Sequence, residues 1–189
     1  MLKRSFDIFF SILALLFLVE IIALFWVLCS IDTRANGFFS QNRVGQFGKI
    51  FRIYKMRTIR DSDGNISILG SILRKYKIDE FPQLWNVLKG DMSFVGPRPD
   101  VSGYYDLLEG EELNILKLKP GITSEASLVY VEEECFLQKQ SDPKGYNDKV
   151  IFRDKVKMNL EYYNNHSLLG DIKIIIKTIF RIFTLISAK

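Results

Sequence analysis

The stretch Ile8-Phe-Phe-Ser-Ile-Leu-Ala-Leu-Leu-Phe-Leu-Val-Glu-Ile-Ile-Ala-Leu-Phe-Trp-Val-Leu-Cys-Ser-Ile31 decides the class of fold, because only Ser11, Glu20 and Ser30 interrupt its apolar character. As an α-helix this stretch is about 36 Å long, which is enough to span a bilayer. A signal peptide has a shorter apolar run that ends in a small-residue cleavage site. We therefore expect a membrane helix that stays attached to the chain.

Basic residues flank the apolar stretch on both sides: Lys3 and Arg4 precede it, and Arg34 and Arg43 follow it. Because cytoplasmic segments are enriched in Lys and Arg, both ends are predicted to lie in the cytoplasm. Glu20 supports this, since a carboxylate at the centre of a spanning helix costs roughly 2.5 to 3.5 kcal/mol on insertion scales. We predict that residues 1–34 form a re-entrant helix, and a single spanning helix that tolerates Glu20 remains the alternative.

The end of the sequence carries a second membrane signal. Residues 168–187 are rich in Ile, Leu and Phe, and Lys173, Lys177 and Arg181 follow one another at intervals of four residues. A helix with such a basic stripe can lie in the membrane interface, with its cations close to anionic headgroups. An interfacial helix is predicted here, with a core helix that has one solvated face as the alternative.

The composition predicts one folded domain beside the membrane helix, and we place it at residues 35–189. The chain has 189 residues, and its 48% hydrophobic and 25% charged residues exclude a disordered protein. Cys29 and Cys135 have no spacing typical of a disulfide framework or a zinc site, and the single His166 lies far from any nucleophile motif. Triad hydrolases are therefore disfavoured.

A small β-hairpin is predicted from Gly37 to Arg60, with a turn at Gly45-Gln-Phe-Gly48 between segments rich in Phe, Ile and Tyr. The remaining patterns are mainly helical, so the predicted fold class is α+β and predominantly helical. The hairpin region is crowded with cations, namely Arg43, Lys49, Arg52, Lys55, Arg57 and Arg60. Such a stretch favours nucleic acid, lipid headgroups or nucleotide phosphates, and charge alone does not choose among them.

A helix is predicted for Asp79-Glu-Phe-Pro-Gln-Leu-Trp-Asn-Val-Leu-Lys-Gly90, following another over Ser67 to Lys77. Its apolar residues recur at i, i+3, i+4 and i+7, with Asp79 placed to cap the beginning and Gly90 the end. A helix N-terminus holds a carboxylate ionised and attracts phosphate. Asp79 and Glu80 are thus suited to phosphoryl chemistry as a nucleophile and a supporting acid, although capping alone also explains them.

Arg98 lies between Pro97 and Pro99, two residues that restrict the backbone on either side of one guanidinium. A guanidinium held in this way is suited to binding two phosphate oxygens at once. The alternative is a plain loop with a solvated arginine.

Taken together and in order, these motifs resemble the bacterial sugar transferase family, the monotopic phosphoglycosyl transferases. The motifs are Arg43-Val-Gly45, Tyr54-Lys-Met-Arg-Thr58, Ile78 through Ser93, Val95-Gly-Pro-Arg-Pro99 and Lys119-Pro-Gly-Ile-Thr123. The resemblance implies transfer of a sugar phosphate from a UDP-sugar to polyprenyl (undecaprenyl) phosphate, with release of UMP, as the first membrane step of glycan assembly. Asp79 would form a covalent phospho-sugar intermediate and hold Mg²⁺, with Glu80 supporting it, and the phosphate-binding residues would be Arg98, Arg74, Lys55 and Arg57.

The resemblance also implies that inner-membrane lipid is a partner, that nucleic acid is not, and that the protein acts at the cytoplasmic face of the bacterial inner membrane. A homodimer is compatible with it.

The sequence departs from the family pattern at two places. The family's Ser-Pro pair in the membrane helix is replaced by Val19 and Glu20, and its Gly-Ile-Thr-Gly turn ends here in Ser124. The sugar and the residues that hold uridine are not identified by the sequence. A UDP-releasing glycosyl transferase and an inactive membrane-docked scaffold remain as alternative functions.

Overall fold

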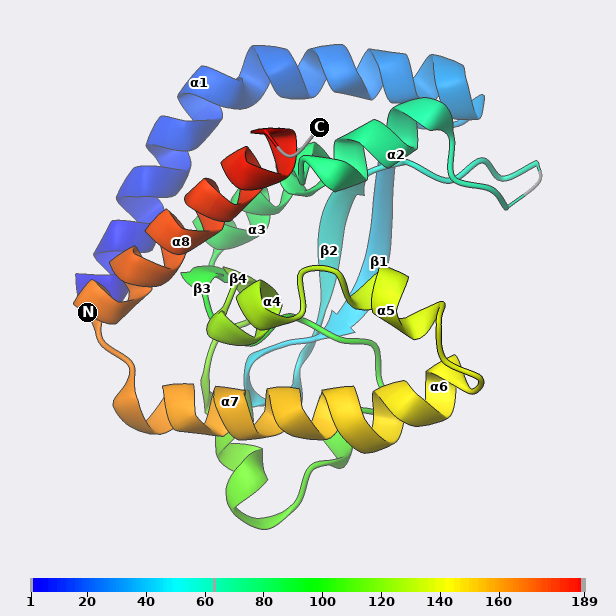
Figure 1. The fold of residues 1–189 in the computed structure, drawn as a ribbon. Helices are drawn as coiled ribbons and strands as arrows, with labels where there is room; N and C mark the ends of the chain where they lie inside the picture. Colours follow the sequence, from blue (N-terminus) through cyan, green and yellow to red (C-terminus); the bar gives the residue numbers. More distant parts are fainter. Residues whose placement is uncertain (1, 63, 188–189) are drawn as a thin grey trace.

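The computed structural model describes residues 2–62 and 64–187, apart from the side chains of residues 134, 183 and 185–187. Its elements confirm the predicted α+β class: the chain is predominantly helical, with one antiparallel hairpin and one short parallel strand pair. A long bent helix runs along one side and across the top of the domain in Figure 1. Its position relative to the other elements determines where the candidate site opens.

Helix α1 (Leu2–Thr33) contains the apolar stretch and is unbroken along its whole length, although it bends (Figure 1). By length and composition it is the one helix among the described residues that could cross a membrane. Only Asp7, Ser11, Cys29 and Thr33 are buried in it. Its middle therefore presents a largely apolar surface, with Phe17 exposed by 74%, that the exposed Glu20 interrupts.

Both ends of α1 are bound to the same folded domain. At the first turn, Arg4 donates hydrogen bonds to the carbonyl oxygens of Val87 (2.6 Å) and Leu88 (2.7 Å). At the last turn, Asp32 pairs with Arg60 at 3.2 Å. A straight helix that crosses a bilayer would carry its ends to opposite sides, whereas this helix returns to the domain from which it starts.

Strands β1 (Phe38–Val44) and β2 (Ile50–Met56) form the predicted hairpin, in register from Phe38 opposite Met56 to Val44 opposite Ile50. The turn η1 (Gln46–Gly48) has left-handed backbone at Phe47 and Gly48. Ile53 packs with Val87 and Met92. The hairpin therefore lies against the helix that follows Asp79 and Glu80, the pair called the dyad below.

The segment around the dyad differs from the prediction. Helix α2 (Ile68–Lys75) begins after the capping residue Ser67 but ends two residues early, because Lys77 adopts a left-handed conformation. A 3-10 turn, η2 (Ile78–Glu80), follows, and helix α3 begins only at Gln83 (Gln83–Lys89). The expected end at Gly90 is confirmed, with a φ of 97°.

The prediction that Asp79 caps this helix is wrong. A cap at residue 79 would accept a hydrogen bond from the amide of residue 81 or 82. Pro82 has no amide hydrogen, and the amide of Phe81 already donates to the carbonyl oxygen of Ile78. The Asp79 side chain is therefore left for another role.

Strand β3 (Ser93–Val95) pairs in parallel with β4 (Gly121–Thr123), and the loop between them contains the 3-10 helices η3 (Tyr105–Leu107) and η4 (Gly110–Lys117). The helices that follow are α4 (Glu125–Val129), α5 (Glu133–Leu137), α6 (Pro143–Tyr146), the π-helix η5 (Asn147–Ile151) and α7 (Phe152–Asn165). Helix α7 contributes Phe152 and Val156 to a buried core cluster whose other members are Val44, Tyr105, Leu108 and Ile115.

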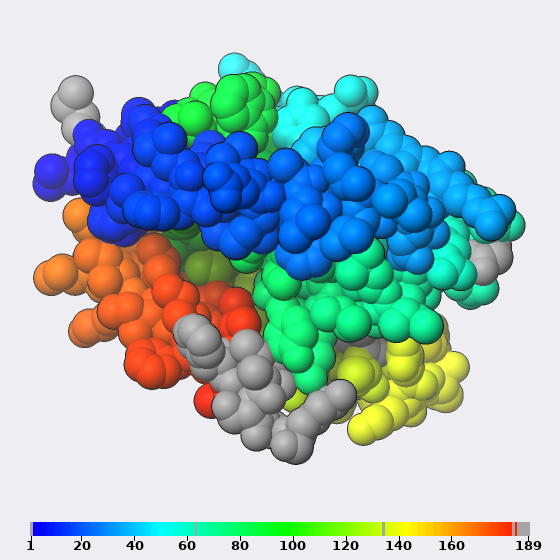
Figure 2. Space-filling view, turned by 90° about the horizontal axis from the view of Figure 1, so that it is seen from above, coloured from blue at the N-terminus to red at the C-terminus, as the bar shows by residue number. Residues whose placement is uncertain are grey.

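Helix α8 (Leu168–Ser187) covers the predicted interfacial segment, and Figure 2 shows it beside α1 on one face of the molecule. Its basic stripe is partly engaged within the protein: Lys177 pairs with Glu125 at 2.9 Å and Arg181 with Glu132 at 3.7 Å. Large apolar residues nevertheless remain exposed on α8, with Phe180 exposed by 67%. The two apolar helices thus share a surface.

Candidate active site

The dyad Asp79 and Glu80 lies in the turn between α2 and α3, and each residue is 6% exposed. Burying two adjacent carboxylates is unfavourable unless cations or hydrogen-bond donors compensate for the lost water. The two residues are compensated very differently, and this difference separates their chemical roles.

Glu80 is held by two cations. Lys55 of β2 donates to its Oε1 at 3.1 Å, and Arg98 forms a two-pronged pair that contacts both oxygens, Oε2 at 3.3 Å. Burial by itself would raise the pKa of Glu80, but the charges of Arg98 and Lys55 outweigh it and hold the pKa well below its usual range. Glu80 is therefore a fixed anion at neutral pH and not a proton carrier.

Asp79 has no such clamp. Its Oδ1 is buried and has no hydrogen-bond partner among the described residues. Burial, together with the neighbouring charge of Glu80, raises the pKa of Asp79 to about 6, against the opposing effect of Lys55, Lys77 and Arg74. At neutral pH the carboxylate is mainly ionised, desolvated and open on one oxygen, which are the properties of a nucleophile or a metal ligand.

The loop Gly96-Pro-Arg-Pro99 places Arg98 against the dyad. Gly96 lies so close to the next strand that a Cβ atom there would be 2.2 Å from the carbonyl oxygen of Lys119. The amide of Gly121 donates to the carbonyl oxygen of Pro97 at 2.8 Å, which fixes the start of the loop. Arg98 was predicted to be presented to phosphate; in the structure it binds Glu80 and 40% of its side chain remains exposed.

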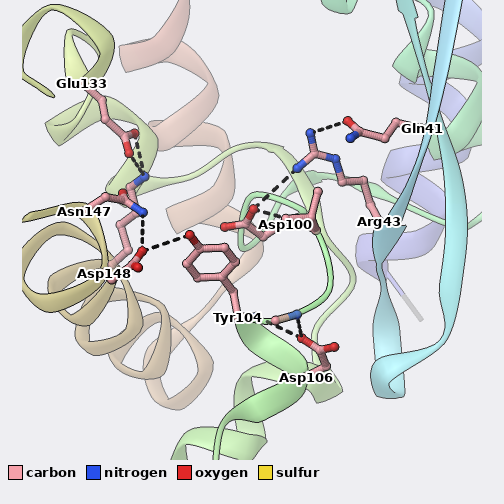
Figure 3. A network of polar contacts seen from close by, with 11 residues as sticks. Gln41, Arg43, Asp100, Tyr104, Asp106, Glu133, Asn147 and Asp148 are labelled. Carbon is pink, nitrogen blue, oxygen red and sulfur yellow. Dashed lines mark hydrogen bonds and ion pairs between the residues drawn. The ribbon is translucent and has the colours of Figure 1, made fainter. Parts of the chain in front are cut away.

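The end of this loop is anchored by the hairpin. Figure 3 shows Arg43 of β1 reaching Asp100, at 3.5 Å, while it also donates to Gln41 at 2.8 Å. The Val44 amide donates to the carbonyl oxygen of Asp100 at 2.9 Å. On the other side of this loop Tyr104 donates to Asp148 at 2.9 Å. Arg43, one of the cations clustered in the hairpin region, thus positions the loop Gly96-Pro-Arg-Pro99, called the arginine loop below.

The remaining predicted phosphate-binding residues are placed unequally. Arg74 donates from Nε to Thr58 at 3.0 Å, and its charge acts to lower the pKa of Asp79, so it lies near the dyad. Arg57 donates to the exposed Asp61 at 2.8 Å and to the carbonyl oxygen of Asn36. Its contacts fix the base of the hairpin.

A cavity of about 550 Å³ opens beside Glu80. Lys77, Glu80 and Arg98 form one polar part of its lining, and Tyr130, Glu133 and Lys155 another. The walls between them include apolar residues of α1 and α8, namely Ala14, Leu18, Ile175, Ile179 and Ile182. Asp79 itself does not line the cavity, although its neighbour Glu80 in the same turn does.

The dyad also limits how a metal could be held. No group of three or more His, Cys, Asp or Glu side chains suited to a metal ion occurs in the described part of the chain. Glu80 has both oxygens engaged, whereas Asp79 has Oδ1 free. One carboxylate with an open oxygen fits Mg²⁺, which commonly binds through one or two carboxylates together with substrate phosphates and water.

Comparison with known proteins supports the family resemblance that the sequence motifs indicated. The family model described as bacterial sugar transferase matches residues 1–185. The chain belongs to the bacterial sugar transferase family. This result confirms the resemblance inferred from the ordered motifs.

Several curated members of the bacterial sugar transferase family are similar to the chain. Galactosyl transferase CpsE of Streptococcus agalactiae is 34% identical over 94% of this chain and 41% of its own length. UDP-N-acetylgalactosamine-undecaprenyl-phosphate N-acetylgalactosaminephosphotransferase of Aeromonas hydrophila is 32% identical over 97% of this chain and 44% of its own length. The sugar transferase EpsL of Bacillus subtilis is 35% identical over 96% of this chain and 87% of its own length. The chain thus spans less than half of two of these relatives.

Within this bacterial sugar transferase fold, the sequence did not single out Lys77 or the polar group Tyr130, Glu133 and Lys155. Lys77 is the left-handed residue that starts the dyad turn and lines the cavity. Its place directly before Ile78 and Asp79 was the available signal. The other three come from the region after Ser124, where the family motifs fade, and only the fold brings them to the cavity.

Proposed function

We propose that the protein transfers a sugar-1-phosphate from a UDP-sugar to polyprenyl phosphate and releases UMP. The observation that carries this proposal is the asymmetry of the dyad: Glu80 is fixed by Lys55 and Arg98, while Asp79 has a buried oxygen without a partner among the described residues. The Aeromonas hydrophila relative is named for UDP-N-acetylgalactosamine and undecaprenyl phosphate, which supports the same pair of substrates.

In the first step, a carboxylate oxygen of Asp79 attacks the β-phosphorus of the UDP-sugar. A new oxygen–phosphorus bond forms, the bond from that phosphorus to the bridging oxygen breaks, and UMP leaves with the electron pair. In the second step, a phosphate oxygen of polyprenyl phosphate attacks the phosphorus held by Asp79. The carboxylate leaves, and the product is a polyprenyl diphosphate sugar.

The cations around Glu80 have a role in both steps. Arg98 and Lys77 line the cavity, where an incoming diphosphate meets them. Glu80 keeps Arg98 and Lys55 in place, because its folded-state pKa lies well below neutral pH and its charge is therefore constant. Cations aimed at developing phosphate charge lower the barrier without reorganising during the reaction.

Mg²⁺ is the cofactor that suits this site, with Asp79 as its protein ligand. When bound, Mg²⁺ would offset diphosphate charge and assist departure of UMP. Asp79 would be the residue that holds it, because its carboxylate is not engaged by a cation as that of Glu80 is and its Oδ1 has no partner among the described residues. Lys55, Arg98 and Arg74 then supply the remaining positive charge near the dyad.

The membrane placement follows from the two apolar helices. We propose that α1 enters one leaflet with its exposed middle and returns, since both of its ends are bound to the same domain. The bend then takes the place of the Ser-Pro kink expected for the family. The apolar cavity walls come from α1 and α8, so a polyprenyl chain can reach the dyad from the lipid on the cytoplasmic face of the inner membrane.

The test is to incubate purified protein with polyprenyl phosphate, Mg²⁺ and a panel of UDP-sugars and to measure UMP and UDP separately. UMP release, together with a phospho-sugar adduct on a peptide containing Asp79, is the expected result. Asp79→Asn should abolish both, and the exposed Asp61→Asn is the matched control that should not. UDP release without an adduct would instead indicate simple glycosyl transfer, the activity for which the Streptococcus agalactiae relative is named.

A further inference from the structure

Helix α3 contains two fully buried side-chain amides that are treated in opposite ways. Asn86 is 0% exposed, and its Nδ2 donates to the carbonyl oxygen of Arg52 at 2.8 Å while its Oδ1 accepts from the Tyr54 amide at 3.1 Å. Gln83 is 1% exposed, and its Nε2 has no hydrogen-bond partner among the described residues. Asn86 therefore ties α3 to the hairpin, whereas Gln83 has a donor without a structural use.

The unsatisfied donor of Gln83 lies near the unsatisfied acceptor of Asp79. The backbone is right-handed helical from Ile78 to Lys89, since Phe81 and Pro82 are also in the αR region. Asp79 lies in the 3-10 turn η2 and Gln83 begins α3, so the two side chains are separated by about one helical turn. Three buried side-chain atoms in the described part of the chain have no partner, and two of them belong to this short segment, Oδ1 of Asp79 and Nε2 of Gln83.

Buried polar atoms without partners are rare in folded proteins and call for a specific explanation. A group that engages both atoms offers Nε2 an acceptor oxygen and offers Oδ1 either a hydrogen-bond donor, as water does, or an electrophilic centre. A phosphoryl group does both, because its phosphorus is attacked by the carboxylate and its non-bridging oxygens accept hydrogen bonds.

We propose that Gln83 is a catalytic residue whose side-chain amide donates a hydrogen bond to a non-bridging oxygen of the phosphoryl group that Asp79 attacks. This inference rests on the proposed function. The bond strengthens as charge gathers on the phosphoryl oxygens, so Gln83 favours the transition state and the phospho-sugar intermediate. It also holds the phosphorus in line with the carboxylate.

The test compares Gln83→Leu with Asn86→Leu in the full chain. Leucine keeps much of the volume of either amide and removes its hydrogen bonds. Three quantities are measured: the thermal midpoint without ligand, the affinity for UDP in the presence of Mg²⁺, and kcat/KM for UMP release. UDP is the probe because its terminal phosphate corresponds to the one that is transferred.

For Gln83→Leu we expect an unchanged or higher midpoint, an affinity for UDP weaker by about 10-fold, and kcat/KM lower by roughly 100-fold. For Asn86→Leu we expect a lower midpoint, because two backbone groups of β2 lose their partner. The two variants should therefore differ in thermal midpoint, which distinguishes a residue that binds substrate from one that stabilises the fold.

A Gln83→Leu variant with a lowered midpoint and unchanged affinity for UDP would overturn the inference, since Gln83 would then be a structural amide that binds internal water. Activity within threefold of the wild type would also overturn it. If the wild type binds UDP but releases no UMP from any donor, the proposed function fails; a loss of UDP affinity in Gln83→Leu would still support the phosphate contact.

Discussion

Replacing the proposed nucleophile Asp79 with asparagine should stabilise the folded protein while it abolishes transfer. The reason is that the fold raises the pKa of Asp79 from 3.8 to about 6. An acid with a raised folded-state pKa is harder to ionise in the folded than in the unfolded chain. Its ionisation therefore destabilises the fold, fully above pH 6 and not at all below pH 3.8.

The size of the effect follows from the pKa difference. About two pKa units correspond to about 3 kcal/mol of unfolding free energy at pH 8, which is an upper limit for the gain in Asp79→Asn. Asparagine loses little in exchange, because Oδ1 of Asp79 accepts no hydrogen bond from the described residues. For a chain of this size the gain corresponds to a rise of roughly 6 to 12 °C in the thermal midpoint.

The assay is thermal unfolding of both proteins from pH 4 to pH 8, with chelator present so that no divalent cation stabilises the wild type. The midpoint difference should be largest at pH 8, decrease as the pH falls through 6, and disappear near pH 4. Asp61→Asn, whose side chain is 69% exposed, is the control and should change stability by less than about 0.5 kcal/mol at every pH. An Asp79→Asn midpoint equal to or below that of the wild type at pH 8 would refute the reasoning.

Three further predictions follow from the same geometry. Because Asp79 must be ionised to attack and has a pKa of about 6, kcat/KM for UMP release should fall tenfold per unit below pH 6, and a flat profile between pH 5 and 7 would contradict this. Gly96→Ala should destabilise the fold by more than about 2 kcal/mol and reduce transfer, since its methyl group would lie 2.2 Å from a main-chain carbonyl oxygen. In the control Gly170→Ala the nearest atom is a serine hydroxyl at 3.2 Å, so unfolding and activity measurements should show neither effect. Lys3→Met should lower the free energy of unfolding by about 3 kcal/mol, because it leaves the buried carboxylate of Asp171 without its cation. Denaturant titration should show that the double variant Lys3→Met/Asp171→Asn largely reverses this loss.

Features with a local cause were predictable from the sequence. The apolar stretch of α1 needs only its composition, and the hairpin follows from β-forming segments on either side of a glycine turn. The end of α3 at Gly90 likewise has a local reason, because glycine adopts the left-handed conformation without strain. The ordered motifs were enough to identify the family, and they singled out Asp79 and Glu80 as candidates.

The prediction that failed, Asp79 as a helix cap, also had a local cause: Pro82 removes the amide that the cap would need. The basic flanks and Glu20 predicted a re-entrant helix, but the sequence offered no local cause for its bend, since Val19 and Glu20 replace the expected Ser-Pro pair. The return of α1 depends instead on contacts at its two ends, with Arg4 bound to α3 and Asp32 to Arg60.

The sequence by itself therefore determined the apolar helix, the hairpin and the family, and it singled out the two carboxylates. Only the tertiary structure decided which carboxylate is fixed and which is open. Lys55 and Arg98 lie 25 and 18 residues from Glu80 and meet it only when the hairpin and the arginine loop pack against the dyad turn. Periodicity and propensity report on neighbours along the chain, whereas the ionisation of a buried carboxylate depends on charges that folding brings within a few ångströms of it.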